Sequence, residues 1–414
     1  MNRRRFLAAG AAALAGCATP LGRAKPRVVV VGAGFGGATA AKYLTLWDRR
    51  LDVTLVERGE RFVSCPISNL VLGGNRSMQD ITRSYDGLRR HGVRLMRGEV
   101  LAVDAAKRAV VLADGGTLAY DRLVLSPGVD FLFGEVQGYE GAQPRVLHAW
   151  KAGPQTVELR RQLEAMPDGG VYLLSVPIAP YRCPPGPYER ACQVAHYFKQ
   201  AKPRSKVLVL DANPDVTSKG PLFKRAWEEL YKGIIEYHPN AKVVTVDAAA
   251  MSVRTDFDTM KADVLNVVPP QRAADIAAKS GLITHNNRWC DVDWRTLESK
   301  AQPGIHVLGD ATLSASGMPK SGHMANQHAK VCAAAVIELL NGRAANASSV
   351  MNNTCYSFVS DKEVIHVASV HQYDAAQNTL LPVKGAGGVS AARSELEGQY
   401  AWSWARNIWA DMLS

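Results

Sequence analysis

The chain has 414 residues, 47% of them hydrophobic, which is enough for two or three domains with sizeable cores. Its formal net charge is +11, or +8 (11 − 3) without Arg3, Arg4 and Arg5. Nucleic-acid binding is not expected, because the sequence has no basic runs interleaved with aromatic residues. The seven cysteines include no C-x-x-C pair and no other metal-ligand spacing, so a zinc site is not expected, whereas disulfides are allowed.

Residues 1–26 indicate an export signal and linker. The stretch Arg3 to Leu7 has the twin-arginine pattern, and the Ala-rich run Phe6 to Ala18 is too short for a stable membrane span. We therefore expect a periplasmic protein. The signal ends in LAGC, which resembles a lipoprotein processing box, so two outcomes remain open: lipidation of Cys17, or ordinary cleavage a few residues later.

A nucleotide-binding unit follows. The apolar strand that begins at Arg27 runs into GAGFGG, which places Gly32, Gly34 and Gly37 in G-x-G-x-x-G spacing before a predicted helix, Ala38 to Trp47. The first glycine allows a tight turn, the second lets the backbone approach a pyrophosphate, and the third lets helix and strand pack closely.

The next strand, DVTLVE, ends in Glu57, twenty positions after Gly37 (57 − 37), where a carboxylate accepts hydrogen bonds from an adenosine ribose. Cys65 lies in the loop just beyond. The segment 88–128 is predicted to be a meander of strands closed by the buried strand Arg122 to Leu125 and a turn at Gly128, which returns the chain to the nucleotide.

A second unit begins with a predicted helix, Gly153 to Met166, and the strand Val171 to Val176. The sequence PIAPYRCPPGPYERA follows where a nicotinamide-binding protein would have a second glycine loop. Prolines remove backbone donors there, so this unit has the fold of a dinucleotide domain without a cradle for NADH or NADPH. Cys183 stands in this stiffened loop, with Glu189 and Cys192 beyond it.

The chain then returns to the first domain. A buried strand ends at Gly309 and Asp310, whose carboxylate suits ribityl hydroxyls. Lys320, in the loop that follows, is a further candidate cofactor-binding residue, and this loop leads into a long Ala-rich helix that contains Cys332, expected in the core. The last segment carries an aromatic stripe, which we expect to pack on its own domain or on a partner rather than on a membrane, at Tyr400, Trp402, Trp404 and Trp409.

Five segments in this order resemble the flavoprotein subunit of flavocytochrome c sulfide dehydrogenase: GAGFGGATAAKYL, the C-P-x-S-N around Cys65, RCPPGPYERA, MPKSG and NTCYS. The resemblance implies a glutathione-reductase-like α/β fold with two Rossmann-type domains and a C-terminal interface domain. The expected division is an FAD-binding domain at 27–150 and 280–350, a second domain at 151–279 and a C-terminal domain at 351–414.

The same resemblance implies FAD linked covalently to Cys65, and a redox disulfide between Cys183 and Cys355 that receives sulfide. Glu189 is implied as an acid or base, and a c-type cytochrome subunit as the electron acceptor. The extra Cys192 leaves a rival pairing with Cys183 open.

Two other functions remain open at this point. One is a membrane-associated sulfide:quinone oxidoreductase, and the other is a tethered flavin module that transfers electrons without its own catalysis. A third alternative concerns only the cysteines: a bridge between Cys183 and Cys355, 172 residues apart (355 − 183), could be structural and have no role in catalysis.

Overall fold

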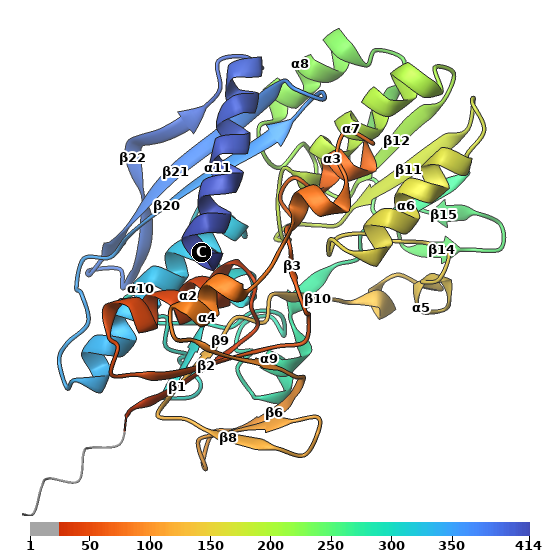
Figure 1. The fold of residues 1–414 in the computed structure, drawn as a ribbon. Helices are drawn as coiled ribbons and strands as arrows, with labels where there is room; N and C mark the ends of the chain where they lie inside the picture. The colour runs from red at the N-terminus through yellow and green to blue at the C-terminus, as the bar shows by residue number, and fades with distance from the viewer. Residues whose placement is uncertain (1–24) are drawn as a thin grey trace, which may run out of the picture.

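The structure is a computed structural model, and it describes residues 25–414. The twin-arginine signal and Cys17 lie outside these residues. The first domain is built on a five-stranded parallel sheet at the bottom of Figure 1. Its strands, in spatial order, are β19 (Ile305–Val307), β9 (Arg122–Leu125), β1 (Arg27–Val31), β2 (Asp52–Glu57) and β5 (Arg94–Arg97).

The apolar run of β1 is buried because this strand lies at the centre of the sheet, hydrogen-bonded on both sides to β2 and β9. Helix α2 (Phe35–Trp47) packs on α10 (Gly322–Leu340), which comes almost three hundred residues later in the chain. The first domain is therefore built from two separate stretches of the chain. Its smaller elements are β3 (Phe62–Val63), α3 (Ser68–Leu72), η1 (Met78–Ile81), β4 (Thr82–Arg83), α4 (Asp86–Arg90), α9 (Asp275–Lys279) and η3 (Gly309–Ala311).

The predicted meander is shorter than expected. Only β6 (Val100–Asp104), β7 (Ala109–Leu112) and β8 (Thr117–Ala119) form it, whereas β5 joins the parallel sheet as an edge strand beside β2. The residues of β5 are half-buried or exposed, a pattern that does not tell the two kinds of sheet apart.

The second domain has a four-stranded parallel sheet of order β13-β12-β11-β17, at the upper right of Figure 1. Its elements are η2 (Phe133–Glu135), α5 (Tyr139–Ala142), α6 (Pro154–Ala165), β11 (Val171–Val176), α7 (Gly186–Ala201), β12 (Lys206–Asp211), α8 (Gly220–Leu230), β13 (Ile235–His238), β14 (Thr245–Asp247), β15 (Ser252–Arg254), β16 (Thr259–Lys261) and β17 (Val264–Val267).

The expected boundary of this domain at 279 is wrong by about ten residues. The sheet ends with β17, and the next strand, β18 (Gln271–Ala273), already pairs with β10 (Val129–Phe131), which leads out of the first domain. Pro269 and Pro270 mark this crossing, and the chain then returns through the paired strand β18 rather than through a long linker.

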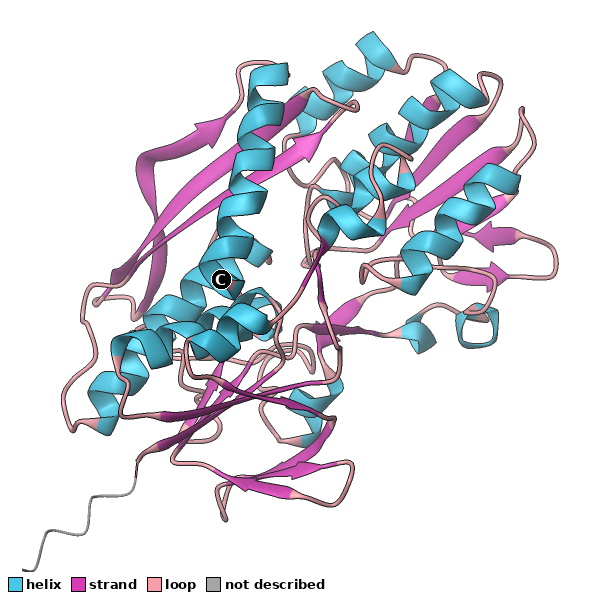
Figure 2. Ribbon diagram, in the orientation of Figure 1, coloured by secondary structure: helices cyan, strands magenta, loops and turns pink. Residues whose placement is uncertain are grey.

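The C-terminal domain is an antiparallel sheet of three long strands covered by one helix: β20 (Val350–Phe358), β21 (Val364–Asp374), β22 (Thr379–Val389) and α11 (Glu395–Leu413). Helix α11 crosses from this sheet to α2, as Figure 2 shows, and its end is buried in the core of the first domain. The aromatic stripe packs on its own chain as predicted, with Trp409 buried and Trp402 and Trp404 against the core, whereas Tyr400 is half exposed.

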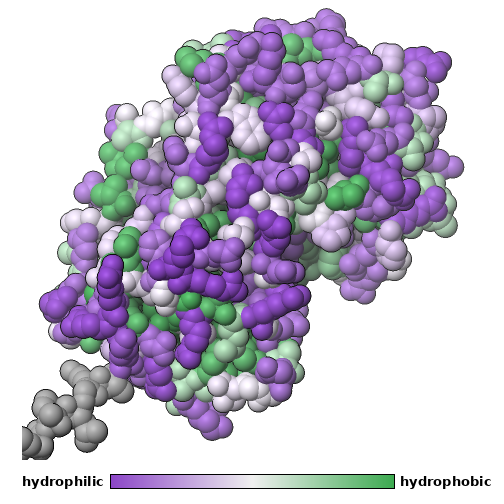
Figure 3. Space-filling model, viewed as in Figure 1, coloured by the Kyte–Doolittle hydropathy of each residue, from purple (hydrophilic) through white to green (hydrophobic). Residues whose placement is uncertain are grey.

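Figure 3 shows that the hydrophobic side chains on this face of the molecule lie in small groups among hydrophilic ones. Within residues 25–414, no helix has the length and the apolar content that a membrane crossing requires.

Candidate functional site

A cavity lies where the three domains meet. Its wall is formed by the glycine loop after β1, the loop after β3, the turn after β9, the loop before α7, the start of α10 and the strand β20. The predicted residues that line it are Gly34, Cys65, Gly128, Cys183, Glu189, Asp310 and Cys355.

The glycine loop has the close contacts that its spacing predicts. A Cβ at Gly37 would lie 1.8 Å from the carbonyl oxygen of Gly32, so helix and strand approach through a position that only glycine fits. Gly32 has a φ of 89° and would itself clash with Ser126. A Cβ at Gly34 meets nothing within 4 Å, because this residue faces the cavity.

Glu57 lies at the end of β2, outside the cavity wall. Its carboxylate accepts hydrogen bonds from the backbone N–H groups of Ala33, at 2.6 Å, and Gly59, at 2.8 Å. The acid therefore orders the glycine loop directly, and this contact adds to the ribose-binding role that its spacing predicts.

Cys65 lines the cavity from the loop between β3 and α3 and is half-buried. Its sulfur accepts a hydrogen bond from the backbone N–H of Ala152 at 3.4 Å. The carbonyl of Cys65 accepts from the Ser68 hydroxyl at 2.6 Å, and Ile67 between them has a φ of 76°, which is rare for a branched side chain. The thiol is thus held on a tightly ordered loop.

Asp310 reaches the cavity from the turn after β19. It is half-buried, and its Oδ1 atom is buried without a hydrogen-bond partner among the described residues. Burial raises the pKa of this carboxyl, while Arg182 and Lys320 oppose the shift. An unpaired buried acceptor that lines a cavity is suited to a ligand hydroxyl.

Lys320 does not reach the cavity with its side chain. The ammonium turns back to the carbonyl oxygens of Asp310, at 3.0 Å, and Thr312, at 2.5 Å, and lies 3.6 Å from the centre of the Trp289 ring. Burial lowers the pKa of Lys320 to about 7. Its backbone carbonyl instead accepts the N–H of Cys183 at 2.8 Å, so Lys320 joins the Asp310 turn to the cysteine loop.

Cys183 lies between β11 and α7, where a second nucleotide loop would be. Its φ is 59°, and its sulfur lies 2.8 Å from a Cβ placed on Gly186, so that a side chain there would collide with it. Tyr181 is buried in the same loop. The loop after β11 is thus filled by side chains, whereas the loop after β1 is open at Gly34.

Cys355 faces the cavity from β20. Asn353 donates from Nδ2 to its sulfur at 3.3 Å, and Lys219 donates from Nζ to its backbone oxygen at 3.1 Å. Burial raises the pKa of the Cys355 thiol, and the positive charge of Lys219 is the strongest influence in the opposite direction. Cys183 and Cys355 are both free thiols in the structure.

Glu189 lies in the first turn of α7, between the two cysteine-bearing segments. Its Oε1 accepts from the backbone N–H of Phe358 on β20, and its Oε2 accepts from Asn69 Nδ2, both at 2.8 Å. Burial raises the pKa of Glu189. The carboxyl is thus anchored at the cavity wall, with its proton affinity shifted towards neutral pH.

Arg190 and Lys219 were missed by the sequence reading. Arg190 is buried, donates to Asn69, Asn266 and two backbone carbonyls, and its guanidinium lies 4.7 Å from the centre of the Trp150 ring. In sequence, the only signal was its place next to Glu189. Lys219 had no signal at all, because it lies in an ordinary polar loop before α8.

The other cysteines of residues 25–414 do not line the cavity. Cys192 is buried on α7 and accepts a hydrogen bond from Trp227 Nε1 at 3.3 Å, which places it in the core of the second domain. Cys290 is buried in the core of the first domain, and Cys332 lies there on α10, as predicted. The rival pairing of Cys183 with Cys192 gains no support from this arrangement, since Cys192 does not line the cavity.

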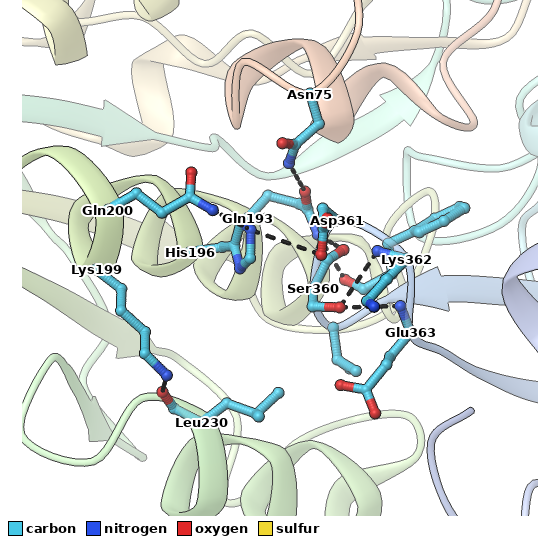
Figure 4. A network of polar contacts seen from close by, with 12 residues as sticks. Asn75, Gln193, His196, Lys199, Gln200, Leu230, Ser360, Asp361, Lys362 and Glu363 are labelled. Carbon is cyan, nitrogen blue, oxygen red and sulfur yellow. Dashed lines mark hydrogen bonds and ion pairs between the residues drawn. The ribbon is translucent and has the colours of Figure 1, made fainter. Parts of the chain in front are cut away.

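Figure 4 shows how α7 is attached to the turn between β20 and β21. Gln193 donates from Nε2 to the carbonyls of Phe358, at 3.1 Å, and Ser360, at 2.7 Å, and accepts from Asn75 at 3.1 Å. One helix turn further, His196 lies 3.7 Å from Asp361. The helix that begins with the Glu189 turn is therefore fixed to the strand that carries Cys355.

The residues present fit FAD. The open space at Gly34 and the start of α2 suit a pyrophosphate, and the unpaired Oδ1 of Asp310 suits a ribityl hydroxyl. Cys65 and Gly128 lie on the same wall.

Three family models match the chain. The central domain of the sulfide dehydrogenase (flavocytochrome c) flavoprotein chain matches residues 156–269, and the flavin-binding domain of flavocytochrome c sulphide dehydrogenase matches 347–413. A pyridine nucleotide-disulphide oxidoreductase model matches 26–164.

Among curated proteins, mitochondrial sulfide:quinone oxidoreductases of Mus musculus and Dictyostelium discoideum are 26% and 25% identical, and each match covers 69% of this chain. The chain spans 65% of the length of these two relatives. The sulfide dehydrogenase flavoprotein chain of Chlorobaculum thiosulfatiphilum is 62% identical over 45 residues, which are 11% of this chain and 94% of that sequence.

Among solved structures, the sulfide:quinone oxidoreductase of Aquifex aeolicus has a TM-score of 0.77 at 17% identity, over 94% of this chain and 91% of that one. NDH2 of Plasmodium falciparum has a TM-score of 0.67 at 13% identity, over 94% and 97%. These likenesses confirm the predicted fold, with its two Rossmann-like sheets and its C-terminal antiparallel domain. Because two models specific to the family match, together with the Chlorobaculum sequence, the chain belongs to the flavoprotein chains of flavocytochrome c sulfide dehydrogenase.

Proposed function

We propose that this chain is the FAD-containing subunit of a periplasmic sulfide:cytochrome c oxidoreductase, in which Cys183 and Cys355 form the redox disulfide. The observation that carries the proposal is that both cysteines line the cavity that the glycine loop and Cys65 also line. They come from two different domains, and Lys320 and Glu189 attach their segments to neighbouring elements.

The cysteine chemistry follows from this placement. Hydrosulfide attacks one sulfur of the Cys183–Cys355 bond; the S–S bond breaks, a persulfide forms on the attacked cysteine, and the other leaves as a thiolate with the electron pair of the broken bond. Glu189 accepts the proton of the incoming hydrosulfide, because its raised pKa lets a buried carboxylate take up a proton. When bound, FAD accepts electrons in pairs and releases them singly to a haem.

A covalent bond from FAD to the Cys65 sulfur is part of the same proposal. Its support is the position of Cys65 on an ordered loop of the cavity wall. Such a bond would keep the cofactor in place outside the cytoplasm, where no flavin pool replaces it. The lipid tether at Cys17 remains a proposal of its own, which mass spectrometry of the mature N-terminus would decide.

The decisive experiment is anaerobic mixing of the purified protein with sulfide and either a soluble c-type cytochrome or a soluble quinone. We expect rapid reduction of the cytochrome and slow reduction of the quinone. A preference for the quinone would favour a sulfide:quinone oxidoreductase, and the lack of any sulfide-dependent reduction would favour a flavin module without its own catalysis.

The cysteine pair is tested with Cys355→Ser, which should keep its flavin and lose sulfide-dependent cytochrome reduction. Cys192→Ser is the matched control, and it should remain active because Cys192 lies in the core of the second domain. Full activity of Cys355→Ser, or a peptide that links Cys183 to Cys192 in the oxidised protein, would contradict the assigned pair.

A further inference from the structure

A buried lysine lies beside the proposed redox pair without an acidic partner of its own. Lys219 comes directly before α8, has a φ of 59°, and is 7% exposed. Its ammonium crosses from the second domain to the C-terminal sheet, where it donates to Cys355 O at 3.1 Å, Ser357 Oγ at 2.7 Å and Ile365 O at 3.3 Å. Three acceptors use all three of its N–H donors.

Within residues 25–414, no carboxylate lies close enough to Lys219 for an ion pair. All three acceptors are neutral, so the positive charge is solvated but not neutralised. A buried ammonium in this state costs several kcal/mol unless nearby groups become anionic. The charge therefore acts on whatever ionisable groups surround it.

The ionisable groups that act most strongly on this charge come from three elements and the loop before α7. They are Cys355 on β20, Cys183 in the loop before α7, Glu189 on α7 and Glu397 on α11. Burial lowers the pKa of Lys219 to about 8, and Cys355 opposes this shift more than the other three. The two glutamates are already held by hydrogen bonds from neighbouring groups, Glu189 by Phe358 N–H and Glu397 by the Ser390 hydroxyl.

The two cysteines do not feel the lysine equally. Lys219 is the strongest influence that lowers the pKa of Cys355, and it is the weakest of the influences on Cys183. Burial and Glu189 raise both pKa values, and Cys355 adds to the rise at Cys183. The asymmetry follows from geometry, since the ammonium is bonded to the backbone of Cys355 itself.

We propose that Lys219 is a positioning residue of the redox pair, whose buried ammonium is the counter-charge of Cys355, so that Cys355 rather than Cys183 is the anionic sulfur after reduction. This inference rests on the proposed function, in which the two cysteines are the redox pair. It also gives the attack a direction. The more acidic thiol is the better leaving group, so hydrosulfide attacks the Cys183 sulfur, the persulfide forms there, and Cys355 is expelled as thiolate.

The test measures thiol acidity and does not require turnover. The full-length flavoprotein is reduced with a phosphine and treated with substoichiometric iodoacetamide from pH 6 to pH 10, and mass spectrometry quantifies alkylation at each cysteine. In the wild type, the midpoint for Cys355 should lie below that for Cys183. In Lys219→Met, the midpoint for Cys355 should rise by about one pH unit or more, which is about ten-fold slower alkylation below the midpoint.

Two further variants make the result specific. Lys219→Arg keeps the charge and should restore alkylation at Cys355 to within about three-fold of the wild type. Lys224→Met is the matched control and should change nothing, because Lys224 lies on α8, just beyond Lys219, and pairs with Asp215 on the surface.

An unchanged Cys355 profile in Lys219→Met, or a wild-type midpoint for Cys183 below that for Cys355, would overturn the proposal. If Lys219→Met does not fold, the order of the two midpoints in the wild type still decides it. Peptide mapping before reduction tests the proposed function separately, because a protein with no bridge between Cys183 and Cys355 fails there while its thiols can still be titrated.

Discussion

The glycine loop makes a prediction that separates stability from cofactor binding. In Gly37→Ala the new Cβ would lie 1.8 Å from the Gly32 carbonyl oxygen, and since real contacts of this kind are not shorter than 3.0 Å, helix α2 must move by about 1.2 Å (3.0 − 1.8). The obstacle is backbone, so no side chain can rotate away. We expect a loss of about 1–3 kcal/mol in the free energy of unfolding, the usual cost of overpacking.

Gly34→Ala is the matched substitution in the same loop. Its φ of −72° and ψ of −165° are open to alanine, and its Cβ would meet no protein atom within 4 Å. The variant should therefore keep or gain stability, by about 0.4–1 kcal/mol, because alanine restricts the unfolded chain. Its methyl group points into the cavity, so we expect much less flavin per protein.

Urea unfolding followed by circular dichroism, together with the ratio of flavin to protein after purification, measures both effects. Gly37→Ala should unfold at lower urea than Gly34→Ala, while Gly34→Ala should contain less flavin than the wild type. If Gly34→Ala is fully loaded with flavin, the loop is not the pyrophosphate cradle. If Gly37→Ala is as stable as the wild type, the close helix–strand contact is not what this glycine secures.

Four other predictions address the cofactor, the buried Lys320 and the contacts between domains. Cys65→Ser should release all flavin into the supernatant on acid precipitation, and flavin that precipitates with the variant would contradict the covalent link. Neither NADH nor NADPH should bleach the flavin rapidly under anaerobic conditions, because the loop 177–185 places prolines and Cys183 where a phosphate cradle would be. The pKa of Lys320 falls from 10.5 to about 7 on folding, so between these pH values the unfolded chain binds one proton more than the folded chain. The stability of the wild type should therefore rise with pH relative to that of Lys320→Met, by up to about 1.4 kcal/mol per pH unit until about pH 10. Urea unfolding of both proteins at pH 6.5 and pH 9.5 measures this difference, and a parallel change in both would refute it. Gln193→Leu removes the donor to two buried carbonyls, so it should lower the free energy of unfolding by about 2–4 kcal/mol. It should also slow the closure of the Cys183–Cys355 bridge after reduction, as measured by thiol titration. Gln200→Leu, on the exposed side of α7, is the control and should have neither effect.

The parts of the site that local spacing defines were predictable. Gly32, Gly34 and Gly37 follow a strand and open a helix, and this order alone implies a close approach of backbone to phosphate. The return of the chain at Gly128 and Asp310 follows from strands that end in glycine turns. Each of these inferences uses residues that lie within about twenty positions of one another in the sequence. Over such short distances, the sequence pattern determines the path of the backbone.

The parts that depend on packing between domains were not predictable from spacing. Lys219 lies 136 positions from Cys355 (355 − 219), and nothing in its loop shows that its side chain crosses to another domain. Lys320 shows the reverse case. Its place in the loop after Asp310 indicated a contact with the cofactor, but its ammonium donates to the carbonyls of its own turn, and only its backbone reaches the cysteine loop.

The two proposed redox sulfurs come from separate domains, so their spacing depends on contacts that cross the domain boundaries. Two such contacts act on Cys183 and its helix: the hydrogen bond from Cys183 N–H to the first domain at Lys320, and those from Gln193 to the C-terminal turn. Lys219 adds a third, on the side of Cys355. Disulfide geometry tolerates little variation in the distance between its two Cα atoms. It follows that substitutions of Gln193 or Lys219, whose side chains make these contacts, should act on bridge formation before they act on flavin retention, because neither residue belongs to the glycine loop.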